Sequence, residues 1–236
     1  IHLGGDSISA MQLMAVCRSS NMAVSVSQIM RSKSIVELAS SVADVEAVLH
    51  DEEQLDKPFG LSPIQKVYFE SMGTGSTHFN QSMLLRTTRT ITPQELSTAL
   101  TTIVKTHSML RARFSCANGD WSQRITNDVA GSYTLRSHTN VDQASLSALI
   151  EESQTCLDIV NGPLFAADMF EMETGDQIVS FVAHPLVVDI VSWNIILQDL
   201  EGLLSSATYS PAKGLAFQTW SSLQDEEARK TLSEYV

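Results

Sequence analysis

The first 45 residues carry a helical pattern of apolar and polar positions. From Ile8 onward the apolar side chains follow one face of a helix, at Met11, Leu13, Met14 and Val16. Residues 24–30 predict a second short helix. A third is predicted to begin at Ser34, where Ser34 as N-cap and Glu37 form a capping box. This part of the chain is therefore expected to be helical.

After residue 60 the pattern alternates between helix and strand. Helices are predicted over 61–72, from Thr92 to His107, and over 141–157 and 190–204, with cap residues at Ser62, Thr92 and Asp142. Strands are predicted over 81–87, 111–115, 121–126 and 177–184. Asn118-Gly119 lies between the middle two strands and is a strong hairpin signal. Strands mixed with packing helices predict a layered α/β domain.

A charged stretch separates the two patterns. Residues 44–57 are rich in Asp and Glu, and Pro58, Phe59 and Gly60 end the stretch. We therefore divide the chain into 1–45, a linker at 46–58, a domain over 59–220, and a final segment at 221–236.

Composition narrows the class of protein. The 236 residues are 43% hydrophobic, enough to bury a core, and the net charge of −12 argues against a nucleic-acid partner. No apolar run is long enough to span a bilayer, and the first residues do not resemble a signal peptide. Cys17, Cys116 and Cys156 are too few for a disulfide framework or a zinc site. A cytoplasmic protein without a membrane partner is expected.

The segment before the first helix suggests a modification site. It reads Leu3-Gly4-Gly5-Asp6-Ser7, followed by Ile8. A lone Asp-Ser before a helix is usually only an N-cap. The full string, however, resembles the prosthetic-group site of a thiolation (peptidyl carrier) domain of nonribosomal peptide synthetases. The resemblance implies that Ser7, beside Asp6, takes up 4′-phosphopantetheine from coenzyme A through a phosphopantetheinyl transferase.

The resemblance to a carrier domain covers about residues 1–45 and departs in one respect. Carrier domains are four-helix bundles, and the helix that precedes this loop has no counterpart here. Without it, core surface is exposed and independent stability is doubtful. The expectation is a partial carrier bundle within a fragment of a longer polypeptide.

The rest of the chain resembles the condensation superfamily, in the style of fungal epimerization domains. Several motifs occur in the family's order: Leu61-Ser62-Pro63-Ile64-Gln65, His78-Phe79-Asn80-Gln81-Ser82, His107-Ser108-Met109-Leu110-Arg111, the strand-opening Gly162-Pro163-Leu164, His184 to Asp189 on H-H-x-x-x-D, and Phe217-Gln218-Thr219-Trp220. The resemblance implies an α+β chain in which a chloramphenicol acetyltransferase-like α/β sandwich lobe at 59–220 follows the carrier. Residues 221–236 would then begin the connection to a second lobe.

The same resemblance implies chemistry on a carrier-bound thioester. Epimerization needs a base and an acid on opposite faces of the α-carbon, and the family credits this role to the second histidine of H-H-x-x-x-D. Here Pro185 stands at that position and Ile190 replaces the usual glycine. Proline cannot act as an acid or a base. We therefore expect this chain alone to catalyse neither epimerization nor condensation.

Three functions are considered for this sequence. The first is a synthetase segment that tethers an aminoacyl or peptidyl thioester on Ser7 and works with an adenylation domain and other synthetase domains. The second is a non-catalytic module that docks carrier domains, which Pro185 favours over an active enzyme. The third is a stand-alone acyltransferase, which the carrier motif and the lost histidine argue against.

The remaining polar residues are expected to be structural. For His184 a hydrogen-bonded structural role is favoured over that of a base, and Asp189 is expected to be buried and paired with Arg111 or Arg113. His184 and Asp189 are too few ligands for a metal site. His107 is expected to pack on an apolar helix face. No partners are visible in the sequence for His2, His50, His78 and His138.

Overall fold

The computed structural model describes residues 7–20, 22–44, 53–72 and 80–234. The chain divides into two compact units, residues 1–50 and residues 51–236. Residues 53–58, predicted to be linker, thus belong to the second unit. Within the described ranges, none of the helices has both the length and the apolar character needed to cross a bilayer.

The first unit contains short helices, as the sequence predicts. Its elements are α1 (Ser7–Ser19), β1 (Met22–Ala23), α2 (Val26–Arg31), α3 (Ile35–Ser40) and β2 (Ala43–Asp44). At the start of α3, the Ser34 hydroxyl accepts a hydrogen bond from the Glu37 amide. The Glu37 carboxylate accepts from the amide of Lys33, one residue before the predicted partner. The predicted capping box is therefore only half formed.

This unit buries little apolar surface in its described part. Ala10 and Val24 are its buried apolar side chains there, whereas Val16, Ile35 and Val36 are exposed. Val36 keeps 80% of its surface in contact with solvent. The described part of this unit therefore has only a small apolar core.

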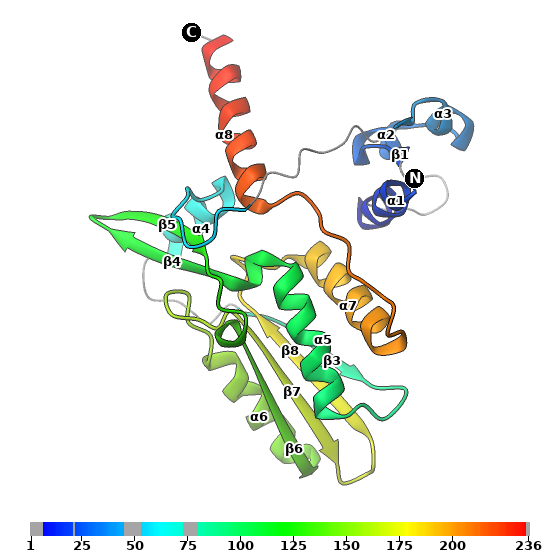
Figure 1. The fold of residues 1–236 in the computed structure, drawn as a ribbon, viewed down its shortest axis with the longest axis vertical. Coiled ribbons are helices and arrows are strands. Elements are labelled where there is room, and N and C mark those ends of the chain that lie inside the picture. The colour runs from blue at the N-terminus through cyan, green and yellow to red at the C-terminus, as the bar shows by residue number, and fades with distance from the viewer. Residues whose placement is uncertain (1–6, 21, 45–52, 73–79, 235–236) are drawn as a thin grey trace. The chain divides into compact units, whose positions relative to one another are not determined.

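The second unit is built on a four-stranded sheet with the order β3-β8-β7-β6. Its strands are β3 (Gln81–Arg86), β6 (Tyr133–Val141), β7 (Phe165–Met172) and β8 (Gln177–Ala183). β6 and β7 are parallel, and the other pairs are antiparallel. Figure 1 shows helices α5 (Pro93–Thr106) and α7 (Ile190–Ser205) on one face of the sheet and α6 (Gln143–Thr155) on the other.

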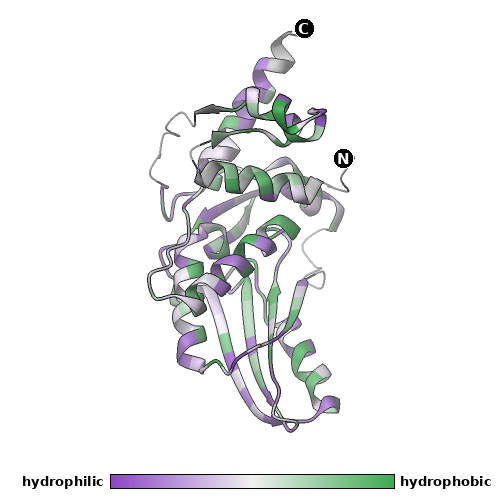
Figure 2. Ribbon diagram, turned by 90° about the vertical axis from the view of Figure 1, so that its right-hand side faces the viewer, coloured by the Kyte–Doolittle hydropathy of each residue, from purple (hydrophilic) through white to green (hydrophobic). Residues whose placement is uncertain are grey.

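The alternation of side chains along the central strands explains this layering. Phe165 and Met169 of β7 and Phe181 of β8 belong to the core under α5 and α7. Phe170 and Val182, which have the opposite parity, pack in the smaller clusters on the side of α6. Because successive side chains of a strand point to opposite faces, a strand buried on both sides must be apolar at nearly every position. Figure 2 colours each residue of these strands by its hydropathy.

A β-hairpin forms a second, smaller sheet. β4 (Ala112–Ala117) pairs with β5 (Asp120–Ile125). Asn118 and Gly119 between them have φ angles of 54° and 90°, the left-handed values that a tight hairpin turn requires. The predicted hairpin is confirmed. It packs with α4 (Pro63–Met72) through a stacked pair of rings, Phe69 and Trp121, with centroids 4.0 Å apart.

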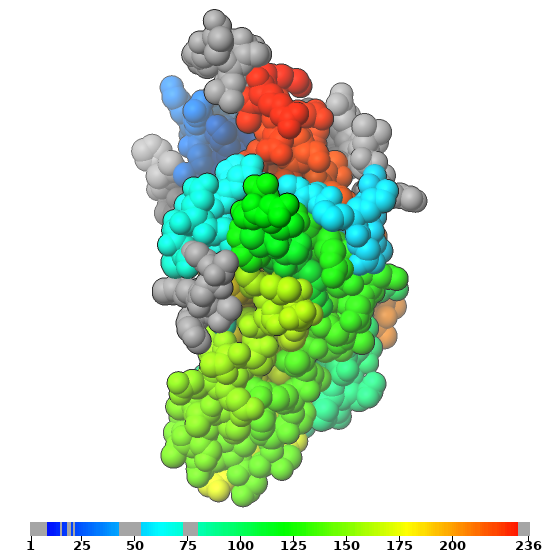
Figure 3. All heavy atoms as spheres, turned by 90° about the vertical axis from the view of Figure 1, so that its left-hand side faces the viewer, coloured from blue at the N-terminus to red at the C-terminus, as the bar shows by residue number. Residues whose placement is uncertain are grey.

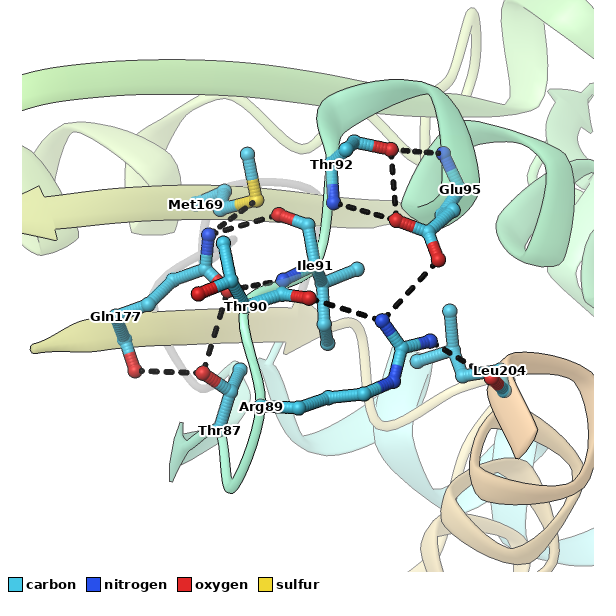
Figure 4. A network of polar contacts seen from close by, with 9 residues as sticks. All are labelled: Thr87, Arg89, Thr90, Ile91, Thr92, Glu95, Met169, Gln177 and Leu204. Carbon is cyan, nitrogen blue, oxygen red and sulfur yellow. Dashed lines mark hydrogen bonds and ion pairs between the residues drawn. The ribbon is translucent and has the colours of Figure 1, made fainter.

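The connection from β3 to α5 is held at both ends by polar contacts (Figure 4). Thr92 and Glu95 form the predicted capping box of α5. The Gln177 side chain binds both backbone groups of Ile91, at 2.8 Å each. Arg89 donates to the carbonyl of Leu204 in the last turn of α7, at 2.7 Å, where a cation also complements the helix dipole. The start of α5 and the end of α7 are thereby tied together.

The sequence reading missed β6 and placed the start of α6 too early. Val141 is the last residue of β6, Asp142 is the N-cap, and α6 begins at Gln143. β7 was not predicted either, although the strand-opening motif Gly162-Pro163-Leu164 stands immediately before its first residue, Phe165.

The polar residues that interrupt the apolar pattern of β6 and β7 form one cluster around a buried carboxylate. The Asp168 carboxylate on β7 accepts from Arg136 Nε at 2.8 Å and His138 Nε2 at 2.8 Å, both on β6. The Ser153 hydroxyl on α6 also donates to it. Asp168 is 1% exposed at its side chain, so these donors compensate a buried charge. His138 therefore has partners that the sequence reading did not find.

Removal of the Asp168 carboxylate should destabilise the second unit strongly. We expect Asp168→Ala to lower the free energy of unfolding by about 3 kcal/mol, because Arg136 and His138 would lose a buried partner. The control is Asp176→Ala, which removes an exposed ion pair with Arg86 and should cost less than about 1 kcal/mol. Urea unfolding midpoints measure both, and equal losses would contradict the assignment.

Candidate functional site

Ser7 is the first residue of α1. A hydroxyl at a helix N-terminus is well placed to carry a phosphodiester, because the free backbone amides and the helix dipole there favour negative charge. Asp6 and the two glycines before it lie outside the described residues.

His184 lies in the turn between β8 and α7 and is completely buried. Its Nδ1 accepts a hydrogen bond from the amide of Leu186 at 3.2 Å. Its Nε2 lies 3.3 Å from the hydroxyl of Tyr68 on α4. With Nδ1 occupied as an acceptor, the neutral ring carries its proton on Nε2 and donates it to Tyr68.

These contacts leave His184 without a lone pair to offer a substrate. Burial also lowers the pKa of His184 to about 4, so the ring is neutral at pH 7. A general base needs a free acceptor within reach of the proton that it removes. The geometry therefore supports the structural role for His184.

Pro185, which the resemblance aligns with the second histidine of H-H-x-x-x-D, is half-buried. The amide of Val187 donates to the carbonyl of His184 across it, at 3.1 Å. Proline suits a turn because its φ is already fixed. The turn is thus complete, although no titratable side chain stands at position 185.

The expected pairing of Asp189 with an arginine was wrong. Asp189 is exposed and is the N-cap of α7. Its Oδ1 accepts from the amide and the hydroxyl of Ser192, each at 2.7 Å. The role is local: the carboxylate satisfies a donor of the first helical turn.

The two arginines instead bind backbone carbonyls. Arg111 donates to Val104 and Thr126, and Arg113 to Ala112 and Gly131. Burial lowers the pKa of both guanidinium groups. These carbonyl acceptors satisfy both guanidinium groups, and Arg111 also lies 3.9 Å from the carboxylate of Glu53.

A pair of buried glutamines holds the His184 turn in place. Gln65 on α4 and Gln123 on β5 exchange two amide hydrogen bonds, at 3.0 and 2.8 Å. Gln65 also donates to the carbonyl of Leu186 at 3.1 Å, and Gln123 to that of Gly60 at 2.9 Å. The only sequence signal for this network was the Pro-Ile-Gln motif that ends at Gln65.

His107 was expected to pack on an apolar face, and its environment is instead polar. It is the C-cap of α5, and its Nε2 lies 2.6 Å from Oδ2 of Asp199 on α7. Tyr209 donates to the other oxygen of Asp199 at 2.7 Å, and this contact raises the pKa of Tyr209 to about 12. The nearly buried Asp199 joins the end of α5, α7 and the segment that follows it.

Comparison with known proteins adds a family match to this geometry. A model of the family described as "Condensation domain" matches residues 57–233. The chain is 65% identical over 237 aligned residues to nonribosomal peptide synthetase 4 of Gibberella zeae. That alignment covers 100% of this chain and 3% of the synthetase.

Solved structures show the same fold. The epimerization domain from the third module of tyrocidine synthetase B matches with a TM-score of 0.64 at 26% identity, over 73% of this chain and 41% of that domain. The condensation domain of the monacolin K polyketide synthase MokA matches with a TM-score of 0.66 at 18% identity, over 76% of this chain and 41% of that chain. The α+β lobe predicted by resemblance is therefore confirmed.

The buried neutral state of His184 predicts a pH dependence. Its pKa is about 4 when folded and 6.5 in the unfolded reference, so between these values the unfolded chain binds the extra proton. The free energy of unfolding should fall as pH drops from 6.5 to 4, by no more than about 3 kcal/mol from this residue. His184→Asn, whose amide oxygen can still accept from Leu186, should flatten that slope in urea titrations. Ring nitrogen NMR with a midpoint near 6.5 would contradict this reading.

Proposed function

We propose that this chain, which belongs to the condensation domain family, tethers a thioester and presents it to its own epimerization/condensation-type lobe. The tether is 4′-phosphopantetheine on Ser7, and the load is an aminoacyl or peptidyl group. The parent protein is a fungal nonribosomal peptide synthetase.

The observation that carries the proposal is the extent of the match to the synthetase. The identity of 65% covers the whole chain, including the residues before the condensation match begins at residue 57. The aligned region therefore includes the residues in which the Leu-Gly-Gly-Asp-Ser segment lies. The position of Ser7 at a helix start fits a phosphodiester.

The cofactor would supply a thiol on a flexible arm, which holds the acyl group as a thioester. The protein's part is to hold the attachment point at the start of α1. A phosphopantetheinyl transferase and coenzyme A would be needed for modification, and an adenylation domain for loading. These partners follow from the chemistry of the tether.

The same chain is proposed to be catalytically inactive alone. Pro185 has no ionisable group, and both ring nitrogens of His184 are engaged. Retention of an intact lobe without the acid–base residue also favours a second candidate, a non-catalytic module that docks carrier domains. In this second candidate the lobe serves as a docking surface for carrier domains.

Loading tests the carrier role. After incubation with a phosphopantetheinyl transferase and coenzyme A, intact mass spectrometry should show one phosphopantetheine adduct, located on Ser7 by peptide mapping. Ser7→Ala should abolish the adduct. Ser9→Ala, a change of the next serine in the same helix, should leave it intact. An adduct that persists in Ser7→Ala would refute the site.

Proton exchange tests the predicted inactivity. With an aminoacyl pantetheine on Ser7 in deuterated water, exchange of the α-hydrogen should be no faster than for the same aminoacyl pantetheine free in buffer. The reason is that Pro185 has no acid–base group and both ring nitrogens of His184 are engaged. NMR or mass spectrometry of the released amino acid measures the exchange, and an enhancement above the free thioester would overturn the prediction.

A further inference from the structure

The last helix of the second unit is reached through a segment without regular structure. The helix is α8 (Phe217–Glu234), and residues 206–216 join it to α7. We name residues 206–216 the connector. Figure 1 shows the connector running back along α7 to the start of α8. The two ends of the connector are held in different ways.

The first end is fixed to α7 by Tyr209. The Tyr209 hydroxyl donates to Oδ1 of Asp199, whose Oδ2 lies 2.6 Å from Nε2 of His107. The Asp199 side chain is only 7% exposed. The Tyr209 ring lies against Gly202, where a β-carbon would stand 2.7 Å from three ring atoms. The Tyr209 amide also donates to the carbonyl of Ser206 at 3.2 Å. A group held by several partners at once is fixed in position.

The middle of the connector is held by very little. Four of the six residues 210–215 are exposed. Within the part of the chain that the structure describes, neither their side chains nor their backbone amides form a hydrogen bond. A β-carbon at Gly214 would meet nothing within 4 Å. A stretch with so few contacts can change conformation without disturbing the core of the unit.

The helix that follows turns its apolar side chains outward. Trp220 and Leu223 are 41% and 51% exposed. The half-buried Phe217 pairs with Trp220 of the same helix, with ring centroids 5.2 Å apart. None of the described side chains of α8 belongs to the four apolar clusters of the unit. The hydrophobic effect therefore contributes little to holding α8 on the lobe.

The face of α8 that lies against the lobe is polar instead. Ser221 on this face is 4% exposed, and it is flanked one turn before and after by half-buried Gln218 and Gln224. Asp225 points toward Gly60, with its Oδ2 4.0 Å from the position that a β-carbon there would take. Figure 3 shows α8 in orange and red next to the light-blue residues near position 55.

The polar contacts of this face are weak. The amide of Gln54 donates to Oε1 of Gln218 at 2.9 Å, in a hydrogen bond exposed to solvent. Oε1 of Gln224 is buried, and no described residue donates to it. A buried acceptor without a donor has lost its water without compensation, which opposes the docked position of the helix.

We propose that α8 is a reversibly docked arm that pivots on residues 210–215 while Tyr209 keeps the start of the connector on α7. In the docked state Gln218 binds the Gln54 amide. In the undocked state that amide and the side chain of Gln224 are hydrated. A partner that binds one state better than the other shifts the population between them. The device lies entirely in the second unit and does not depend on modification of Ser7.

Gln224→Leu tests the arm, because it removes the unpaired acceptor and adds apolar surface at a half-buried position. The readout is hydrogen exchange of the Gln54 amide in the full chain, measured by NMR. In the unsubstituted chain this amide should exchange at least about tenfold faster than that of Phe59, which donates to the Gln123 carbonyl at 2.8 Å. In Gln224→Leu the exchange of Gln54 should slow by about tenfold, and that of Phe59 should not change.

The matched control is Glu226→Leu, which adds the same side chain at an exposed position of α8. Leu, Glu and Gln have similar helix propensities, so this control should change the Gln54 rate by less than about twofold. An unchanged Gln54 rate in Gln224→Leu, or the same change in both variants, would overturn the proposal.

Relaxation dispersion of backbone ¹⁵N in the unsubstituted chain tests the pivot without any substitution. Exchange broadening should occur in the amides of α8 and of Gln54, with one common rate. The amides of Ser206 and Tyr209 should show none, because they lie on the fixed side of the pivot. Broadening that includes Tyr209 would mean that the whole connector moves, and a flat profile along α8 would mean that the arm stays docked. Either result would contradict the proposed pivot.

Discussion

The buried pair Gln65–Gln123 is the interaction on which the candidate site depends. Each side-chain amide binds the other, and the remaining groups bind the Ser62 amide and the carbonyls of Gly60 and Leu186. A buried amide that lost one partner would cost about 1–3 kcal/mol, so the members of such a network fix one another's positions. Through it, α4, the β4–β5 hairpin and the His184 turn form a single framework. The hairpin and α4 are far from the turn in sequence, and polar contacts bring them together.

Elements with local signals were predictable, and those defined by distant partners were not. The capping box at Thr92 and the turn at Asn118-Gly119 involve residues within four positions of each other, and both were found. β6 was missed because Arg136 and His138 interrupt its apolar pattern, and their partner Asp168 lies 32 and 30 positions away. The wrong partner for Asp189 has the opposite origin, because its actual partner, Ser192, lies only three positions away. A carboxylate in a conserved-looking motif suggested burial and an ion pair, whereas the local need of a helix N-terminus took precedence.

For the candidate site, the positions of His184 and Pro185 came from the sequence, and the resemblance suggested their roles. Neither could show which other residues these two contact. The sequence placed His184 and Pro185 next to each other and showed that the second has no proton chemistry. It did not show that both nitrogens of His184 are engaged, because Tyr68 and the turn geometry are visible only in three dimensions. This contact pattern does not involve the side chain at position 185. Loss of the histidine there is therefore compatible with an intact turn, and the fold of the lobe gives no measure of its activity.

The motif residues that define the family here act mainly as framework. His107 binds Asp199, Arg111 binds two carbonyls and approaches Glu53, and Gln65 supports the His184 turn. Gln218, in the last motif, accepts a hydrogen bond from the amide of Gln54. Such residues are constrained by several partners at once, so each would resist substitution whether or not the lobe performs a reaction. Preservation of these motifs is consequently weak support for catalysis.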